Sequence, residues 1–143
     1  MLVLRQKMIY REDIQSNPDI LYVFGDNLER VGRGGQAKEM RGEPNSFGIA
    51  TKRLCDHGYP ECYFHDTQKD VIDILCTEFD RLERKLQQST KHSYGQLGWL
   101  YIRHWKGVVI PMDGLGTGLS KLQDYAPKAL DYIETRINDL KVL

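Results

Sequence analysis

The sequence predicts an α/β fold in which helices cover both faces of a sheet, a three-layer α/β/α sandwich. Short apolar runs alternate along the chain with segments whose apolar side chains recur every three to four residues. The runs at 21–24 and 108–110 are apolar on both faces, which is typical of strands covered on both sides. With 143 residues and 41% apolar side chains, the chain suits one core, so we expect residues 1–143 to form a single domain.

Five strands are expected, each bounded by turn residues. They span residues 2–9, 20–24, 47–51, 100–104 and 107–112. The second and the last of these strands run directly into glycine-containing loops. Because the carboxyl ends of parallel strands meet at one edge of a sheet, we expect the two loops to flank one crevice.

Three helices are expected from the spacing of apolar residues. The longest covers about residues 66–88, and the C-terminal helix covers about residues 122–140, with Pro127 early, where proline is tolerated. A shorter helix lies at about residues 35–42. Residues 87–96 are polar, and we predict that they form a mobile loop.

Charge, hydropathy and cysteine usage narrow the function classes. Lys and Arg number 20, as do Asp and Glu, so no global positive field favours DNA or RNA as the main ligand. No apolar run is long enough to cross a bilayer, and residues 1–10 lack a secretory signal. Cys55, Cys62 and Cys76 are an odd number and are interpreted as free thiols. We therefore expect a cytoplasmic protein that does not contact membrane.

The first glycine loop, residues 25–38, follows the strand at 20–24 and precedes the short helix. Its glycines, Gly34 and Gly35 among them, let the backbone approach a ligand closely, and free N–H groups at a helix start attract phosphate. A phosphate-bearing ligand suits this position. A glycine-rich helix entry that binds nothing is the alternative.

The second glycine loop, residues 111–120, also follows a buried strand and precedes a helix. Gly114, Gly116 and Gly118 alternate with other residues and place the Thr117 hydroxyl between two glycines, a backbone cradle suited to a diphosphate. The loop lacks the Gly-Lys-Ser/Thr of a P-loop and the spacing of the dinucleotide fingerprint. Kinase-like chemistry and hydride transfer therefore lose support, and no cofactor is expected.

The two loops and their surroundings resemble the macrodomains, a family that binds ADP-ribose. Glu12-Asp13-Ile14 is similar to the Gly-Asp-Ile signature whose aspartate takes the adenine amino group. Asn27 is like the asparagine that ends the second motif of the family, and residues 32–37 look like the glycine loop that faces the distal ribose. The resemblance implies a macrodomain-like sandwich with a mixed sheet. The segment 24–52 also looks like a signature of small phage and bacterial proteins.

The second glycine loop is most similar to the terminal ADP-ribose glycohydrolase subclass. The phosphate loop of that subclass reads Gly-Cys-Gly-Leu-Asp-x-Leu, where residues 116–122 read Gly-Thr-Gly-Leu-Ser-Lys-Leu. Its Ile-Thr-Lys strand end is matched by Ala-Thr-Lys at 50–52. Ser120 stands at the position of the catalytic aspartate, and Asp113 or Asp26 could substitute for that acid. Binding is therefore better supported than catalysis.

The resemblance implies a role for each matching residue. Lys52, with Asp113, is the expected catalytic pair, because an amine whose pKa is lowered by burial can attack an anomeric carbon; a surface lysine that contacts phosphate or solvent is the alternative. The residues expected to bind the ligand are Asp13, Ile14, Asp26, Asn27, Gly34, Gly35, Gln36, Gly114, Leu115, Gly116, Thr117, Gly118 and Leu119.

One cluster suggests another class of function. Cys55, His57, Cys62 and His65 are all zinc-ligand types, but their spacing is not a standard pair, so we expect no metal and treat a metal-stabilised interaction domain as an alternative. The function expected first is binding of ADP-ribose or a close derivative with hydrolysis of an ADP-ribosyl bond. A catalytically inactive ADP-ribose reader is the second. The expected partner of this chain, as a monomer, is ADP-ribose or an ADP-ribosylated protein or nucleic acid.

Overall fold

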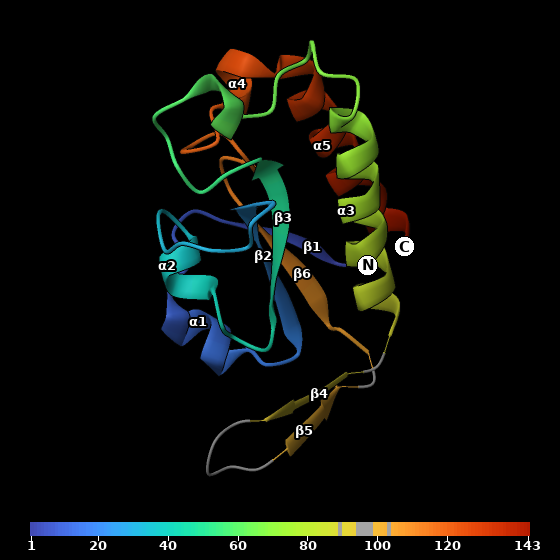
Figure 1. Ribbon diagram of the computed structural model, residues 1–143. Helices are drawn as coiled ribbons and strands as arrows, with labels where there is room; N and C mark the ends of the chain where they lie inside the picture. The colour runs from blue at the N-terminus through green and yellow to red at the C-terminus, as the bar shows by residue number, and fades with distance from the viewer. Residues whose placement is uncertain (89, 94–98, 103) are drawn as a thin grey trace.

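The computed structural model describes residues 1–88, 90–93, 99–102 and 104–143. These residues form an α/β protein around a four-stranded parallel sheet with the strand order β1-β6-β2-β3 (Figure 1). The strands are β1 (Val3–Gln6), β2 (Ile20–Asn27), β3 (Ser46–Lys52) and β6 (Gly107–Pro111).

Helices lie on both faces of this sheet (Figure 1). They are α1 (Arg11–Ser16), α2 (Ala37–Met40), α3 (Val71–Gln87), α4 (Leu122–Tyr125) and α5 (Pro127–Asp139), with short 3₁₀ turns at Pro60–Cys62 and Leu140–Val142. None of the helices within the described residues is long and apolar enough to span a membrane.

The alternation of β2 explains the two-sided packing, because successive side chains of a strand point to opposite faces. Leu21 and Val23 belong to the larger apolar cluster, which includes buried side chains of α3 and α5. Tyr22 and Phe24 belong to a second cluster with residues of α1 and α2. The amphipathic helices and the apolar central strands therefore bury each other on both sides of the sheet.

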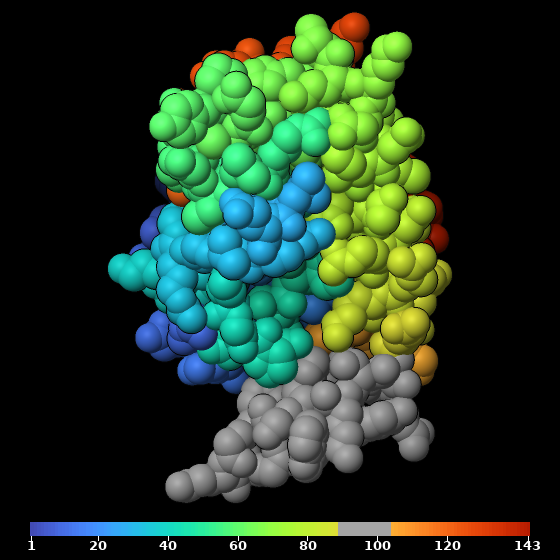
Figure 2. Space-filling model, in the orientation of Figure 1, coloured from blue at the N-terminus to red at the C-terminus, as the bar shows by residue number. Residues whose placement is uncertain are grey.

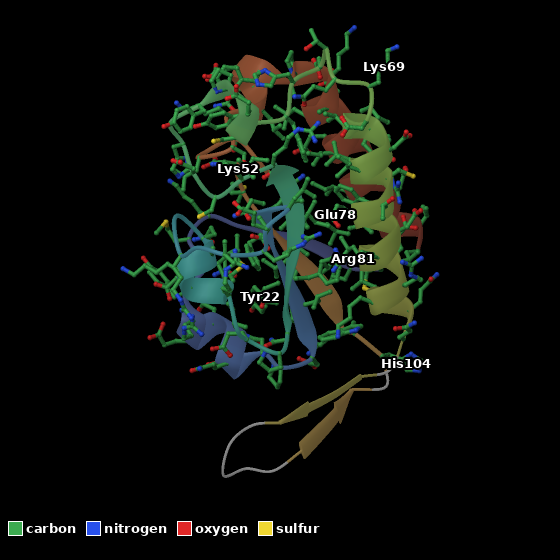
Figure 3. The ribbon with its side chains drawn as sticks, viewed as in Figure 1. Tyr22, Lys52, Lys69, Glu78, Arg81 and His104 are labelled. Carbon is green, nitrogen blue, oxygen red and sulfur yellow. The ribbon has the colours of Figure 1, made fainter. Side chains whose placement is uncertain are left out.

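The edge strand β3 is covered by a buried carboxylate from α3. Oε1 of Glu78 accepts a hydrogen bond of 2.6 Å from the backbone N–H of Ala50. The same carboxylate pairs with Arg30 at 2.6 Å and Arg81 at 2.7 Å, and Figure 3 shows Glu78 directed from α3 toward β3. A paired edge N–H is closed to another strand, and a buried carboxylate is tolerated here because two guanidinium groups flank it.

Several sequence predictions need correction. The four-stranded sheet is parallel throughout, so the expected mixed sheet is wrong for the described part of the chain. The prediction of a mobile loop at 87–96 is wrong for residues 90–93, which form strand β4 (Thr90–Ser93). This strand pairs antiparallel with β5 (Trp99–Ile102) in a separate sheet. Position 89 and positions 94–96 of that loop, and position 103 of the strand predicted at 100–104, lie outside the described residues.

Other boundaries differ for identifiable reasons. The helix predicted from residue 66 begins at Val71, because the carboxylate of Asp66 instead accepts the backbone N–H groups of Lys128 and Ala129 at the start of α5. The strand predicted at 2–9 is confined to β1. Helix α1 was not predicted, since six residues are too few to establish a helical period.

Candidate functional site

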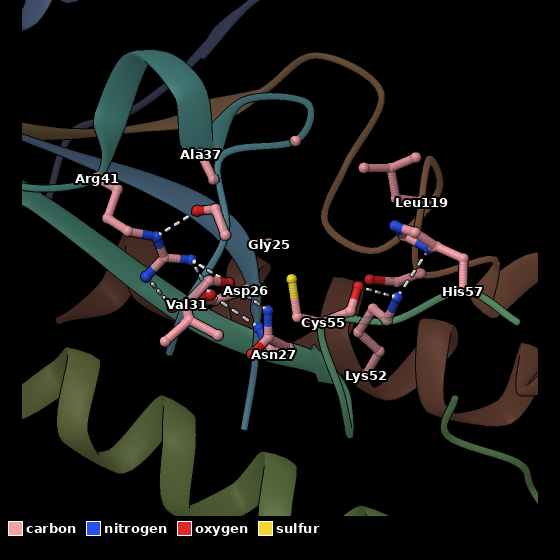
Figure 4. Close-up of a pocket in the computed structure, with 13 residues that line it drawn as sticks. Gly25, Asp26, Asn27, Val31, Ala37, Arg41, Lys52, Cys55, His57 and Leu119 are labelled. Atoms are coloured by element: carbon pink, nitrogen blue, oxygen red, sulfur yellow. Dashed lines mark hydrogen bonds and ion pairs between the residues drawn. The ribbon is translucent and has the colours of Figure 1, made fainter. Parts of the chain in front are cut away.

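Two adjoining hollows lie where β2, β3 and β6 end. The larger, which we call the outer cleft, measures about 530 Å³ and is lined by Lys7 and Met8, by residues 34–36 and by much of the segment 111–120. The smaller, the inner pocket, measures about 60 Å³ and is lined by residues of β2, β3 and the loops after them (Figure 4). Gly25, Gly34, Leu119 and Ser120 line both. The outer cleft has the size of a small-molecule site, whereas the inner pocket holds about two water molecules.

The first glycine loop is held in shape by Arg41. Its guanidinium pairs with the buried carboxylate of Asp26 and donates hydrogen bonds to the carbonyl oxygens of Gly32, at 2.7 Å, and Arg30, at 2.9 Å. Asp26 also accepts the backbone N–H of Asn27 at 2.9 Å. The Asp26 carboxylate is therefore occupied by anchoring the loop.

The two glycine loops contact each other. A Cβ atom at Gly34 would lie only 2.8 Å from Cδ1 of Leu119, so a larger residue there would displace the Leu119 side chain. The first loop also contacts the segment after β3: the backbone N–H of Cys55 donates to Glu29 at 2.7 Å. Figure 2 shows the first loop in light blue against this green segment on one face of the molecule. Three chain segments thus enclose the inner pocket.

The second glycine loop presents free backbone donors. Gly114 and Gly116 have φ angles of 91° and 82°, conformations that favour glycine. Internal hydrogen bonds fix the loop. The side chain of Gln123 donates to the carbonyl oxygen of Thr117 at 2.8 Å, and the backbone N–H of Leu122 donates to the carbonyl oxygen of Gly116 at 2.9 Å. The N–H groups of residues 115–120, by contrast, donate to no group in the described part of the protein. Such a run of free N–H groups is an anion-binding arrangement.

The N–H groups of residues 32–36 in the first glycine loop behave in the same way: none has a partner among the residues that the structure describes. Residues 34–36 of this run line the outer cleft, so two of the segments that form the cleft carry free backbone donors. A ligand that offers several anionic oxygens between the loops matches this arrangement.

Two of the three buried side-chain acceptor atoms that lack a partner in the described chain belong to residues that line these hollows. Asn27 is 7% exposed and lines the inner pocket; its Nδ2 donates to the Val31 carbonyl at 2.8 Å, while its Oδ1 has no partner in the described chain. Oε1 of Gln36, which lines the outer cleft, is buried without a partner in the same sense. Buried acceptors are normally satisfied, so each is available to a ligand hydroxyl or amino group.

Lys52, at the end of β3, places its amine in the inner pocket (Figure 4). The residue is 4% exposed. Its Nζ lies 2.8 Å from the Asp56 carbonyl oxygen, 3.4 Å from that of Cys55 and 3.0 Å from Nδ1 of His57. Burial lowers the pKa of Lys52, although the nearby Cys62, Cys55, Asp56 and Glu29 act in the opposite direction.

Not all predicted site residues come together. Asp26, Asn27 and Lys52 line the inner pocket. Leu115 is buried in the core. The other glycine-loop residues predicted to bind line the outer cleft: Gly34, Gly35, Gln36, Gly114, Gly116, Thr117, Gly118 and Leu119. Asp113 is exposed in the outer cleft, whereas Lys52 lies in the inner pocket.

Asp13 and Ile14 lie in α1 and line neither hollow. Oδ2 of Asp13 accepts the Tyr10 backbone N–H and Nε2 of Gln6, each at 2.9 Å, so this carboxylate caps the helix. Ile14 is fully buried in the second apolar cluster.

Arg41, Cys55 and His57 line the inner pocket but were not predicted to do so. His57 carried a signal in the sequence, the cysteine and histidine cluster, which suggested a metal. Cys62 is instead buried, and Nε2 of His65 lies 2.8 Å from the Pro60 carbonyl oxygen. Within the described residues, no group of three or more His, Cys, Asp or Glu side chains is placed to hold a metal ion.

One family model matches the chain, over residues 4–98, and its description is a family of unknown function, DUF7831. The match includes Asn27, Lys52 and His57 and ends before the second glycine loop. No curated protein and no solved structure matches the chain. The chemistry of the site must therefore be argued from its own residues.

Proposed function

The chain belongs to DUF7831, a family of unknown function, and from its site we propose that it binds ADP-ribose or a close derivative and hydrolyses an ADP-ribosyl bond. A macrodomain-like three-layer sandwich is part of the proposal. Helices on both faces of the parallel sheet support this architecture.

The observation that carries the proposal is the run of free N–H groups at residues 115–120 beside the outer cleft. A diphosphate offers many acceptor oxygens and negative charge, and backbone donors in a preformed loop bind it without reorganisation. Each hydrogen bond to a charged oxygen contributes about 1.5 to 3 kcal/mol. Residues 34–36 of the first loop, whose N–H groups are also free, line the same cleft and supply further donors.

Each of the two hollows is assigned a different part of the ligand. The outer cleft, at about 530 Å³, accommodates the adenosine diphosphate portion. The distal ribose extends past Gly34 and Leu119 toward the inner pocket, where Oδ1 of Asn27 accepts one of its hydroxyl groups. Asp13 lines neither hollow, so its proposed contact with the adenine amino group requires adenine to extend beyond the outer cleft to Oδ1, because Oδ2 is the oxygen that caps α1.

Hydrolysis is assigned to Lys52. In its neutral form, the lone pair of Nζ bonds to the anomeric carbon of an ADP-ribosyl ester as the bond from that carbon to the ester oxygen breaks. The bond electrons leave with the carboxylate, and water then cleaves the carbon–nitrogen bond to release ADP-ribose and the amine. The burial that lowers the pKa of Lys52 supports this role.

A catalytically inactive ADP-ribose-binding module is the second candidate. Ser120 favours it, since no carboxylate stands at that position and its hydroxyl lies 2.6 Å from Thr51 Oγ1. Binding without turnover of an ADP-ribosylated ester would select this candidate.

Calorimetry with ADP-ribose, ADP and adenosine tests the proposal. We expect micromolar-range affinity for ADP-ribose and much weaker binding of adenosine, because adenosine lacks the diphosphate that the free N–H groups would bind. Equal affinity for ADP-ribose and adenosine would refute the phosphate cradle. Release of ADP-ribose from a glutamate-linked substrate then separates the hydrolase from the inactive module.

A further inference from the structure

In its ammonium form, Lys52 carries no free lone pair. A lysine ammonium has three N–H donors, and Nζ has three acceptors around it: the carbonyl oxygens of Asp56 and Cys55 and Nδ1 of His57. Its charge is also placed over the ring of Tyr63, 4.8 Å from the ring centroid. The ammonium must therefore lose a proton before Lys52 can act as a nucleophile.

Only one of the three acceptors can take that proton, because carbonyl oxygens are not bases in water. Nδ1 of His57 lies 3.0 Å from Nζ and accepts from the ammonium when the ring carries its own proton on Nε2. Of the acids considered from the sequence, Asp26 lines the same pocket but is paired with Arg41, and Asp113 lines the outer cleft.

We propose that His57 is the proton acceptor of Lys52 and carries its proton to solvent. The Nζ–H bond breaks, its electron pair stays on nitrogen as the lone pair, and the proton bonds to Nδ1. The imidazolium then loses its Nε2 proton to water, which leaves the ring protonated on Nδ1. Uptake of a proton from water at Nε2 and loss of the Nδ1 proton to solvent restore the starting tautomer. His57 is exposed whereas Lys52 is buried, so the ring connects the amine to bulk water.

Three contacts fix His57 beside the amine. Oδ1 of Asp56 accepts the backbone N–H groups of His57 at 2.7 Å and Gly58 at 3.2 Å, which closes a turn. The hydroxyl of Tyr63 donates to the His57 carbonyl at 3.2 Å, and the ring of the same tyrosine faces Nζ of Lys52. Tyr63 therefore positions both members of the pair.

The charges around the pair favour such an exchange. Burial lowers the pKa of Lys52 and brings the ammonium closer to imidazole in acidity, against the attraction of Cys62, Cys55, Asp56 and Glu29. On the α4 side, Nζ of Lys121 lies 5.9 Å from the Tyr63 ring centroid, and Arg41 lines the opposite wall of the pocket. The catalytic meaning of His57 rests on the proposed function, but the proton exchange does not.

The first test measures proton exchange without any ligand. Nuclear magnetic resonance of protein with ¹⁵N-labelled lysine gives the rate at which the Lys52 Nζ protons exchange with water. We expect His57→Gln, which keeps a polar side chain but cannot relay a proton, to slow this exchange at least tenfold. The control His65→Gln should leave it unchanged, and Lys85, which lies outside the pocket, serves as an internal reference in every variant. An unchanged Lys52 rate in His57→Gln overturns the proposal.

The second test uses hydrolysis of a glutamate-linked ADP-ribosyl substrate. His57→Gln should lower kcat by about 10²- to 10⁴-fold, the range for loss of a positioned base. Added imidazole should restore activity to His57→Ala, an effect that a structural role of the ring would not produce. If the wild type binds ADP-ribose but shows no turnover, the proposed hydrolysis fails while the exchange measurement still decides the role of His57. Normal kcat in both His57→Gln and His57→Ala overturns the proposal that His57 accepts the proton of Lys52.

Discussion

The hydroxyl of Ser120 lies 2.6 Å from Oγ1 of Thr51, so the second glycine loop is bonded to the end of β3. Oγ1 of Thr51 is also 3.2 Å from the Asp26 carbonyl oxygen, which can only accept. The threonine must then donate to Asp26, and Ser120 donates to the threonine. Ser120 and Thr51 thus link the second glycine loop to the ends of β2 and β3 beside the inner pocket.

Loss of this link should cost stability. We expect Ser120→Ala to lower the free energy of unfolding by about 1 kcal/mol, because a buried hydrogen bond between hydroxyl groups is lost. Urea denaturation measures the change. Thr135→Ala is the matched control, since that hydroxyl bonds to the Asp131 carbonyl on an exposed face of α5 and should matter less. An equal effect of the two substitutions would contradict the assigned hydrogen bond.

The shape of the second glycine loop depends on Gly116 and not on Gly118. Gly116 has a φ of 82°, and a Cβ atom there would collide with Cδ1 of Leu122, whereas a Cβ at Gly118 meets nothing within 4 Å. Gly116→Ala should therefore lower the free energy of unfolding by about 1 to 3 kcal/mol and weaken ADP-ribose binding in calorimetry. Gly118→Ala is the control and should change both only slightly. Normal binding by Gly116→Ala would show that the loop conformation is not needed for the ligand.

The two oxygens of Asp13 separate a structural role from a binding role. Asp13→Ala should lower the free energy of unfolding by about 1 kcal/mol through loss of the helix cap at the Tyr10 N–H. If Oδ1 also accepts the adenine amino group, ADP-ribose should bind the wild type more tightly than its hypoxanthine analogue does, by on the order of 1 to 3 kcal/mol. The same substitution should abolish this preference. Equal binding of the two ligands by the wild type would leave Asp13 as a helix cap.

The sequence predicts the parts of this protein whose signal is local. The strands β2 and β6 can be predicted because burial on both faces requires continuous apolar runs. Helix α3 can be predicted because burial of one face requires apolar residues every three to four positions. Both glycine loops and Lys52 are visible as well, since they directly follow strands. The parallel sheet places these segments at one edge, as expected.

The rest of the candidate site depends on contacts between residues of different segments, which no local sequence pattern predicts. The ion pair of Arg41 with Asp26 joins residues on different elements, and the contact of His57 with Lys52 follows from a turn made by the Asp56 side chain. In the sequence, His57 stands out only as a zinc-ligand residue type near two cysteines, whose spacing is not a standard pair. For Asp13, a short motif predicts a ligand contact, and the structure adds a helix cap made by one of its two carboxylate oxygens.

The lowered pKa of Lys52 predicts how stability depends on pH. The folded state holds the proton of Lys52 less tightly than the unfolded state, whose lysine has a pKa near 10.5. Between the two pKa values the unfolded chain binds more protons, so this residue makes the free energy of unfolding rise as pH increases toward 10.5. Lys52→Met should remove that contribution. Urea denaturation at several pH values should therefore show the wild type gaining stability relative to Lys52→Met as the pH rises, and a constant difference would contradict the assignment.

Kinetics of Lys52 variants decide whether the amine attacks or merely holds the ligand. If Nζ is the nucleophile, Lys52→Ala should abolish release of ADP-ribose while leaving the Kd for ADP-ribose nearly intact, because the interaction lost is one made in the transition state. If the amine only contacts the ligand, the same variant should raise KM and Kd together and retain most of kcat. Lys52→Arg keeps a cation in the inner pocket but removes the nucleophile, so it should behave like Lys52→Ala in the first case and like the wild type in the second. Mass spectrometry after quenching with borohydride should detect an adduct of ADP-ribose on the peptide that carries Lys52 in the wild type alone; an adduct that persists in Lys52→Arg would place the nucleophile on another residue.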